Sequence, residues 1–180
     1  MVEGALVLIT GMPGAGKTTL AKMFGEKGYT VIKMGDVIRE LSAGRGLEPT
    51  HANLGNTARD IRAKGGDSAV AVECIKKLEG MGEVKVVIDG IRSIAEVDAF
   101  RERFETTLIA VHASPSTRYS RLRARCRTDD PMDWETFHTR DMRELGFSLG
   151  WAVAQADHMI VNEETVQVMR GRFNEILGML

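Results

Sequence analysis

One nine-residue stretch constrains the fold of this 180-residue chain more than any other feature. It reads Gly-Met-Pro-Gly-Ala-Gly-Lys-Thr-Thr over residues 11–19, between a short apolar run at 5–10 and a helical pattern that begins at residue 20. Strand, glycine-rich loop and helix in this order are the context in which Gly-x-x-x-x-Gly-Lys-Thr forms a phosphate-binding loop. The sequence therefore predicts a nucleoside triphosphate site at the end of a buried strand.

The residue types of this loop explain how it would hold phosphate. Its glycines let the backbone curl so that successive N–H groups point into one concavity, where the positive end of the following helix adds a fixed field. Lys17 can reach the outer phosphates, and the Thr18 hydroxyl can complete a Mg²⁺ shell. We expect ATP to be bound, as its Mg²⁺ complex, by Gly11, Gly14, Ala15, Gly16, Lys17, Thr18 and Thr19.

Composition excludes several classes of protein. The hydrophobic content of 43% and charged content of 27% are ordinary for one globular domain, here spanning residues 1–180. A net charge of −1 makes a general nucleic-acid binder an unfavourable interpretation. Cys74 and Cys126 form no metal-binding pattern, and no apolar run approaches the length that a membrane span needs. We expect a cytoplasmic protein without a membrane segment, whose oligomeric state the sequence does not define.

Five apolar runs with strand character recur along the chain, at residues 5–10, 30–34, 84–88, 107–112 and 158–161. Because helical patterns separate them, the chain is predicted to be α/β, with helices on both faces of a five-stranded parallel sheet. Two connections exceed what a crossover requires. We expect residues 36–82 to form a helical insertion that binds a phosphate acceptor, and residues 127–140 to form a short lid.

A carboxylate follows the third of these runs. The sequence Val-Lys-Val-Val-Ile-Asp-Gly at residues 84–90 has the form of a strand whose terminal acid holds Mg²⁺ beside the phosphate loop. An aspartate in this position can also cap the next helix. We expect Asp89 and Thr18 to be the metal ligands.

Arginines gather downstream of the fourth run. Between Ser114 and Thr128 there are five arginines and no acidic residue, and Arg118, Arg121 and Arg125 share one helical face. Like charges at this spacing destabilise a helix unless an anion lies against them. A solvated basic face and a triphosphate-binding face are both consistent with the pattern, and the absence of local acids favours the second.

Two further arginines follow the second and third runs. Arg39 lies in Gly-Asp-Val-Ile-Arg at 35–39, and Arg92 follows Asp-Gly-Ile at 89–91. A guanidinium fork suits an immobile phosphate group, so a second phosphate site facing the loop is predicted. Donor and acceptor sites facing each other are typical of a small-molecule kinase.

These residues resemble those of nucleoside monophosphate kinases of the adenylate kinase group, over nearly the whole chain. The segments that carry the resemblance are Gly35-Asp36-x-x-Arg39, Asp89-Gly-Ile-Arg92, Arg121 with Arg125, and Arg127-Thr-Asp-Asp130 with Arg140. The longer strings at 34–40, 89–93, 140–145 and 156–162 resemble an archaeal family of adenylate-kinase-related proteins. That family is often described as dephospho-coenzyme-A-kinase-like, and its substrate is unsettled.

The resemblance implies Mg-ATP-dependent phosphoryl transfer to a small phosphorylated acceptor, such as a nucleotide or a nucleotide-like metabolite. The catalytic residues that it implies are Lys17, Arg92, Arg121, Arg125, Arg127 and Arg140. The acceptor-binding residues would be Gly35, Asp36, Arg39, Arg92 and Glu96.

Glu96 departs from the family pattern, which has glutamine at this position. An ionised glutamate only accepts hydrogen bonds, so a guanine or another donor-rich edge would suit it better than adenine. The alternative is that Glu96 is a solvated helix residue.

Other functions remain open at this point. A regulatory ATPase that acts on a protein or RNA partner is one, and a dephospho-coenzyme A kinase is another. The sequence does not distinguish ATP from GTP as donor. It contains neither the Asn-Lys-x-Asp of a guanine-specific switch nor the Leu-Ser-Gly-Gly of a transporter ATPase.

Overall fold

The computed structural model describes residues 6–81, 85–125 and 130–180. Its strands form one five-stranded parallel sheet with the order β2-β3-β1-β4-β5. The strands are β1 (Leu6–Thr10), β2 (Thr30–Lys33), β3 (Val86–Ile91), β4 (Thr106–His112) and β5 (His158–Val161). The predicted α/β fold with a five-stranded parallel sheet is confirmed.

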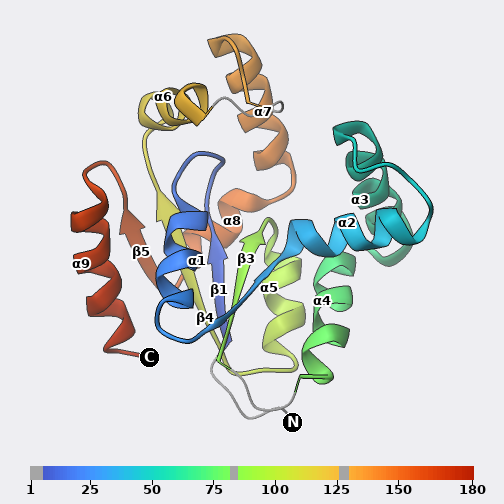
Figure 1. Cartoon of the computed structure of the whole chain (residues 1–180), viewed down its shortest axis with the longest axis horizontal. Helices are drawn as coiled ribbons and strands as arrows, with labels where there is room; N and C mark the ends of the chain where they lie inside the picture. The colour runs from blue at the N-terminus through green and yellow to red at the C-terminus, as the bar shows by residue number, and fades with distance from the viewer. Residues whose placement is uncertain (1–5, 82–84, 126–129) are drawn as a thin grey trace.

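Helices connect the strands and cover both faces of the sheet (Figure 1). In chain order they are α1 (Lys17–Gly25), α2 (Met34–Gly44), α3 (His51–Gly65), α4 (Ala69–Glu79), α5 (Ile94–Arg101), α6 (Pro115–Arg125), α7 (Trp134–Gly146), α8 (Leu149–Ala154) and α9 (Val166–Leu177).

The core consists of two layers separated by the sheet. Leu6 and Leu8 of β1 pack with α2, α4, α5 and α8, whereas Val7 and Ile9 pack on the other face with α1 and α9. All five residues of β1 are buried. A central parallel strand is covered on both faces, which is why its sequence is continuously apolar and not alternating.

The strand ends differ slightly from the prediction. β2 stops at Lys33 because Met34 already belongs to α2, and β3 continues past Asp89 to Ile91. Asp89 pairs with Ile9 of β1 and with Lys33 of β2. The carboxylate therefore lies two residues before the end of β3, beside the strand that leads into the phosphate loop.

The two long connections are helical where the structure describes them. The first contains α2, α3 and α4, which pack against one another, and α4 also packs on α5. The second leads through α7 and α8, and Figure 1 shows α6 and α7 beyond the carboxyl ends of the strands. Two predictions remain untested: that the first segment binds an acceptor, and that the second closes as a lid.

Candidate active site

The phosphate loop is fixed in place by close contacts with β4 and with the residue that follows β5. Gly11 and Gly16 have φ of 139° and 113°, a region that L side chains rarely adopt. A Cβ at Gly11 would lie 2.2 Å from the Val111 carbonyl oxygen, and one at Gly16 would lie 2.3 Å from Asn162 Nδ2. The Asn162 amide donates a hydrogen bond of 2.8 Å to the Ala15 carbonyl. Glycine is therefore required at both positions by space as well as by backbone conformation.

Lys17 begins α1 and turns back over its own loop. Its Nζ donates hydrogen bonds to the carbonyls of Gly11 at 2.7 Å and Met12 at 3.2 Å. Burial lowers the pKa of Lys17 to about 8, against the opposing attraction of Asp89. Phosphate oxygens arriving at this point would offer the ammonium group better partners than the two carbonyls.

Thr18 and Asp89 lie side by side where the sequence places a metal ion. The Thr18 hydroxyl donates to Asp89 Oδ2 over 3.2 Å. Burial raises the pKa of Asp89, and the nearby Lys17 charge partly offsets this effect. A hydroxyl and a carboxylate are hard oxygen donors, and together with phosphate oxygens and water they fit the octahedral shell that Mg²⁺ prefers.

A cavity of about 430 Å³ opens over Thr18 and the phosphate loop. Its lining joins the phosphate loop to residues of β3, α6, α7 and α8 that are far away in sequence. The residues that line it include Gly11, Gly14, Gly16, Lys17, Thr18, Thr19, Arg92, Arg121, Arg125, Arg140 and Glu144. Most of the predicted catalytic and phosphate-binding residues are thus brought together; Arg127 lies outside the described residues.

The cavity arginines are held by neighbouring oxygens. Arg121 donates to the Asn162 carbonyl over 2.9 Å. Arg125 makes a two-pronged contact with Asp130, with one hydrogen bond of 3.0 Å from Nε. Arg140 of α7 approaches the same carboxylate at 3.7 Å. One buried aspartate therefore orients two arginines, one from each helix, at the cavity.

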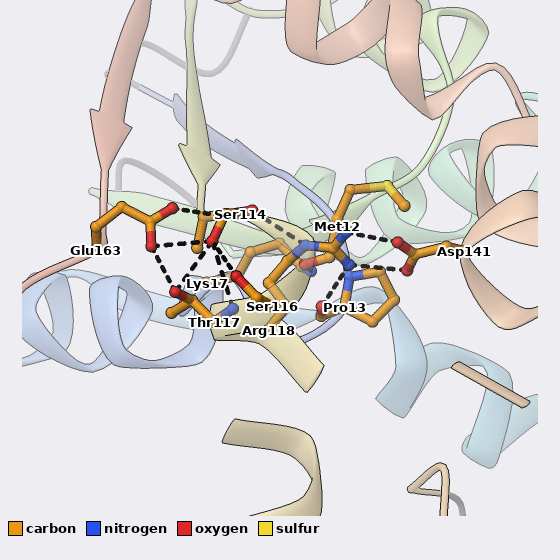
Figure 2. Close-up of polar contacts among 10 residues, drawn as sticks. Met12, Pro13, Lys17, Ser114, Ser116, Thr117, Arg118, Asp141 and Glu163 are labelled. Atoms are coloured by element: carbon orange, nitrogen blue, oxygen red, sulfur yellow. Dashed lines mark hydrogen bonds and ion pairs between the residues drawn. The ribbon is translucent and has the colours of Figure 1, made fainter. Parts of the chain in front are cut away.

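Arg118 does not share the environment of Arg121 and Arg125. It is 3% exposed and forms a bidentate ion pair with Asp141 of α7, with one hydrogen bond of 2.8 Å. It also donates to the carbonyls of Ala113 and Pro13 (Figure 2). The sequence suggested that a triphosphate balances the charge of Arg118. In the structure, Asp141 of α7 balances it instead.

Glu163, which follows β5, caps the start of α6. Its carboxylate accepts hydrogen bonds from the Ser114 backbone N–H and, over 2.6 Å, from the Thr117 hydroxyl (Figure 2). The Thr117 hydroxyl bond, followed by the Ser114 N–H bond, lowers the pKa of Glu163. An acidic residue at a helix N-terminus also complements the helix dipole, so β5 and α6 are joined beside the phosphate loop.

The expected acceptor residues are only partly assembled. Arg92 lines the cavity and its NH1 lies 3.5 Å from Glu144 Oε2. Arg39 instead pairs with Asp36 on an exposed face of α2. Among the described residues that line the cavity, Gly35, Asp36 and Arg39 are all absent. The two arginines predicted for a second phosphate site are therefore not brought together, since Arg92 lines the cavity and Arg39 does not. The second phosphate site itself stays a prediction.

Glu96 is fully buried, so the solvated interpretation of this residue is wrong. Its carboxylate accepts hydrogen bonds from the Arg92 backbone N–H at 2.7 Å and from Arg62 at 3.2 Å. Burial raises the pKa of Glu96, against these two donors. Together with Arg62, Asp67 and Phe147, it lines a small depression beside the main cavity.

Sequence reasoning missed Glu144, a 4% exposed glutamate on α7 that lines the cavity. It lies four residues after Arg140, so the two side chains share one face of α7. That spacing was visible in the sequence, although nothing there indicated which face of α7 would meet the phosphate loop.

Known proteins share the family profile and the fold of this chain. A family profile described as an AAA domain matches residues 7–167. Among solved structures, a shikimate kinase from Bacteroides thetaiotaomicron superposes with a TM-score of 0.68 at 19% identity, covering 97% of this chain and 98% of that one. The TT1252 protein from Thermus thermophilus gives a TM-score of 0.67 at 18% identity, covering 98% of each chain. At such identities the likeness establishes the fold alone, a five-stranded parallel α/β sheet covered by helices.

Curated relatives are much closer in sequence. The chain is 45% identical to the UPF0200 protein MJ1399 of Methanocaldococcus jannaschii, over 96% of this chain and 88% of the relative. It is 41% identical to a UPF0200 protein of Hyperthermus butylicus, over 97% and 94%. The chain therefore belongs to the AAA-domain family and is one of the UPF0200 proteins. In the part of the chain that the structure describes, no helix is long and apolar enough to cross a membrane.

Proposed function

We propose that this protein transfers the γ-phosphoryl group of Mg-ATP to a small-molecule acceptor. The observation that carries the proposal is a single cavity in which Lys17 and Thr18 of the phosphate loop face Arg92, Arg121 and Arg140. A switch protein needs the loop and a metal ligand, but it does not need an enclosing set of arginines from three other elements. Phosphoryl transfer does need such a set of arginines, because its catalysis consists of positioning and charge stabilisation.

The donor side of the mechanism follows from the loop. Its backbone N–H groups and Lys17 would hold the β- and γ-phosphates, and Thr18 and Asp89 would hold Mg²⁺, directly or through water. The bound ion would supply charge neutralisation on those phosphates. Arg121 and Arg125 would stabilise the negative charge on the moving phosphoryl group from α6. Arg140 would do so from α7, and the segment that contains Arg127 would complete the lid.

The acceptor enters, on this proposal, beside Arg92. The resemblance to nucleoside monophosphate kinases supports a phosphorylated, nucleotide-like acceptor, with Gly35, Asp36 and Arg39 on its far side. In the structure Arg39 pairs with Asp36 away from the cavity, so α2 would have to approach α7 for Arg39 to take part. Glu96 would act by fixing Arg92 and Arg62, because both of its oxygens already accept hydrogen bonds.

The test is ADP formation from Mg-ATP, alone and with a panel of acceptors. The panel holds AMP, GMP, CMP, UMP, their deoxy forms and dephospho-coenzyme A, and GTP is compared as donor. Strong stimulation by one acceptor, with a matching phosphorylated product, is the expected result. The Lys17→Ala variant should be inactive in the same assay, and Arg39→Ala should raise the acceptor KM with little change in ATP binding. Near-normal transfer by Lys17→Ala would contradict the proposal.

Two alternatives give different results in this assay. A regulatory ATPase that acts on a protein or RNA partner would release ADP at one rate whatever small acceptor is present. A dephospho-coenzyme A kinase would respond to that compound alone. The net charge of −1 makes RNA the less favourable of the two macromolecular partners.

A further inference from the structure

The Glu144 carboxylate is an unusual group in a cavity built for phosphate. It is 4% exposed, and its two ion pairs are long: 3.5 Å from Oε2 to Arg92 NH1 and 3.6 Å from Oε1 to Arg143 NH2. Burial lowers the pKa of Lys17, and the negative charge of Glu144 acts on that pKa in the opposite direction. Glu144 is therefore close enough to the phosphate loop for its charge to be felt there.

The position of this charge bears on the chemistry of the acceptor. Arg92 is the guanidinium that the cavity offers on the acceptor side, and Glu144 already neutralises part of its charge. A phosphate acceptor is an anion that needs surrounding cations and has no proton to lose. A hydroxyl acceptor is neutral, and it must lose a proton to form a phosphate ester. A buried carboxylate repels an anionic phosphate acceptor, whereas it can accept the proton of a hydroxyl acceptor.

We propose that the group phosphorylated by this protein is a hydroxyl, and that Glu144 receives its proton. The inference rests on the proposed phosphotransferase function and narrows its substrate class. The hydroxyl oxygen forms a bond to the γ-phosphorus while the bond from that phosphorus to the β,γ-bridging oxygen breaks. The hydroxyl proton passes to a Glu144 carboxylate oxygen, ADP leaves with the bonding electron pair, and Glu144 later loses the proton to water. The acceptor can carry a phosphate elsewhere in the molecule, provided that the reacting atom is a hydroxyl oxygen.

Three other carboxylates described above are less suited to this role. Asp89 accepts the Thr18 hydrogen bond at the position proposed for Mg²⁺. Asp36 pairs with Arg39, and its side chain is 50% exposed. Asp130 is engaged by Arg125 and Arg140. Glu144 combines burial, long ion pairs and a place in the wall of the cavity, where an incoming hydroxyl group can reach it.

Binding of adenosine 5′-tetraphosphate tests whether Glu144 excludes a further phosphate group from the acceptor side of the cavity. This compound extends ATP by one phosphoryl group toward the acceptor side, and calorimetry with Mg²⁺ gives both dissociation constants. We expect the wild type to bind it no more tightly than ATP. Glu144→Gln should bind it about tenfold more tightly, with ATP affinity changed less than about threefold. Glu135→Gln is the matched control, because Glu135 is an exposed residue of the same helix.

Two results would contradict the statement that Glu144 excludes a second phosphate from the acceptor side of the cavity. One is a wild type that binds the tetraphosphate about tenfold more tightly than ATP, which needs no variant. The other is a folded Glu144→Gln protein whose preference equals that of Glu135→Gln. Absence of ATP binding by the wild type would instead overturn the proposed function, and this inference with it.

Basal ATP hydrolysis tests the proton transfer, because water is the simplest hydroxyl acceptor. Glu144→Gln should lower the single-turnover hydrolysis rate by about 100-fold without weakening ATP binding. A rate within about threefold of wild type would remove Glu144 as proton acceptor. A protein that hydrolyses ATP by way of Glu144 but responds to no acceptor of the panel would retain this inference about Glu144, whereas the metabolite-kinase function would fail.

Discussion

Replacing Arg118 by methionine tests whether α7 is held on the phosphate loop by a buried ion pair. The Arg118 and Asp141 side chains are 4% and 11% exposed, and Arg118 also donates to the carbonyls of Ala113 at 3.1 Å and Pro13 at 3.2 Å. Methionine fills a similar volume but leaves the Asp141 carboxylate buried without its cation. Removing one partner of such a pair costs about 3–5 kcal/mol. For a chain of this size we expect a fall in Tm of about 6–20 °C.

Urea unfolding followed by circular dichroism gives the free energy of unfolding directly. Arg103→Met is the control, because the Arg103–Glu79 pair is exposed and its loss should cost about 0–1 kcal/mol. In the double variant Arg118→Met/Asp141→Leu no charge is left unpaired, so most of the lost stability should return. A loss below about 1 kcal/mol in Arg118→Met, or a double variant no more stable than the single one, would refute the reasoning.

Three further predictions concern single side chains. Gly16→Ala should weaken Mg-ATP binding by at least about tenfold in calorimetry, because its Cβ would lie 2.3 Å from Asn162 Nδ2; Gly28→Ala, which also has positive φ but meets nothing within 4 Å, should bind normally. Burial raises the pKa of Cys74 to about 12, so peptide mapping after iodoacetamide treatment at pH 8 should find it labelled at least about 100-fold more slowly in native protein than in urea. Burial raises the pKa of Glu96, so the folded protein keeps that proton to higher pH than the unfolded chain, and the stability of wild type relative to Glu96→Gln should fall as pH rises above 4.5; a pH-independent difference in urea midpoints would contradict this.

The phosphate loop and the sheet could be predicted because both are encoded over short distances. The loop needs glycines with positive φ, a lysine and a threonine within nine consecutive residues, and each strand needs one contiguous apolar run. The boundaries were less predictable. Met34 starts α2, although the sequence predicted that the apolar run of β2 extends to residue 34, since helix and strand both accept this residue and packing decides between them.

The arginine side of the site shows where sequence reasoning was insufficient. Arg118, Arg121 and Arg125 share one helical face and one local composition, yet Arg118 is buried in an ion pair while the other two line the cavity. The acids that distinguish them are Asp141, 23 residues beyond Arg118, and Asp130, five residues beyond Arg125. The Arg118–Asp141 pair depends on how α6 and α7 pack, and no local pattern records that packing.

By itself, the sequence determined that this chain forms a parallel α/β sheet with a phosphate loop at its carboxyl edge. Local backbone preference and burial on both faces of the strands are sufficient for both features. Only the tertiary structure decided that Glu96 fixes Arg62 and Arg92, that Arg39 pairs outside the cavity, and that Glu144 lines the same cavity as Lys17. The role of a charged side chain depends on its neighbours in space, and packing sets those neighbours after the strands and helices have formed.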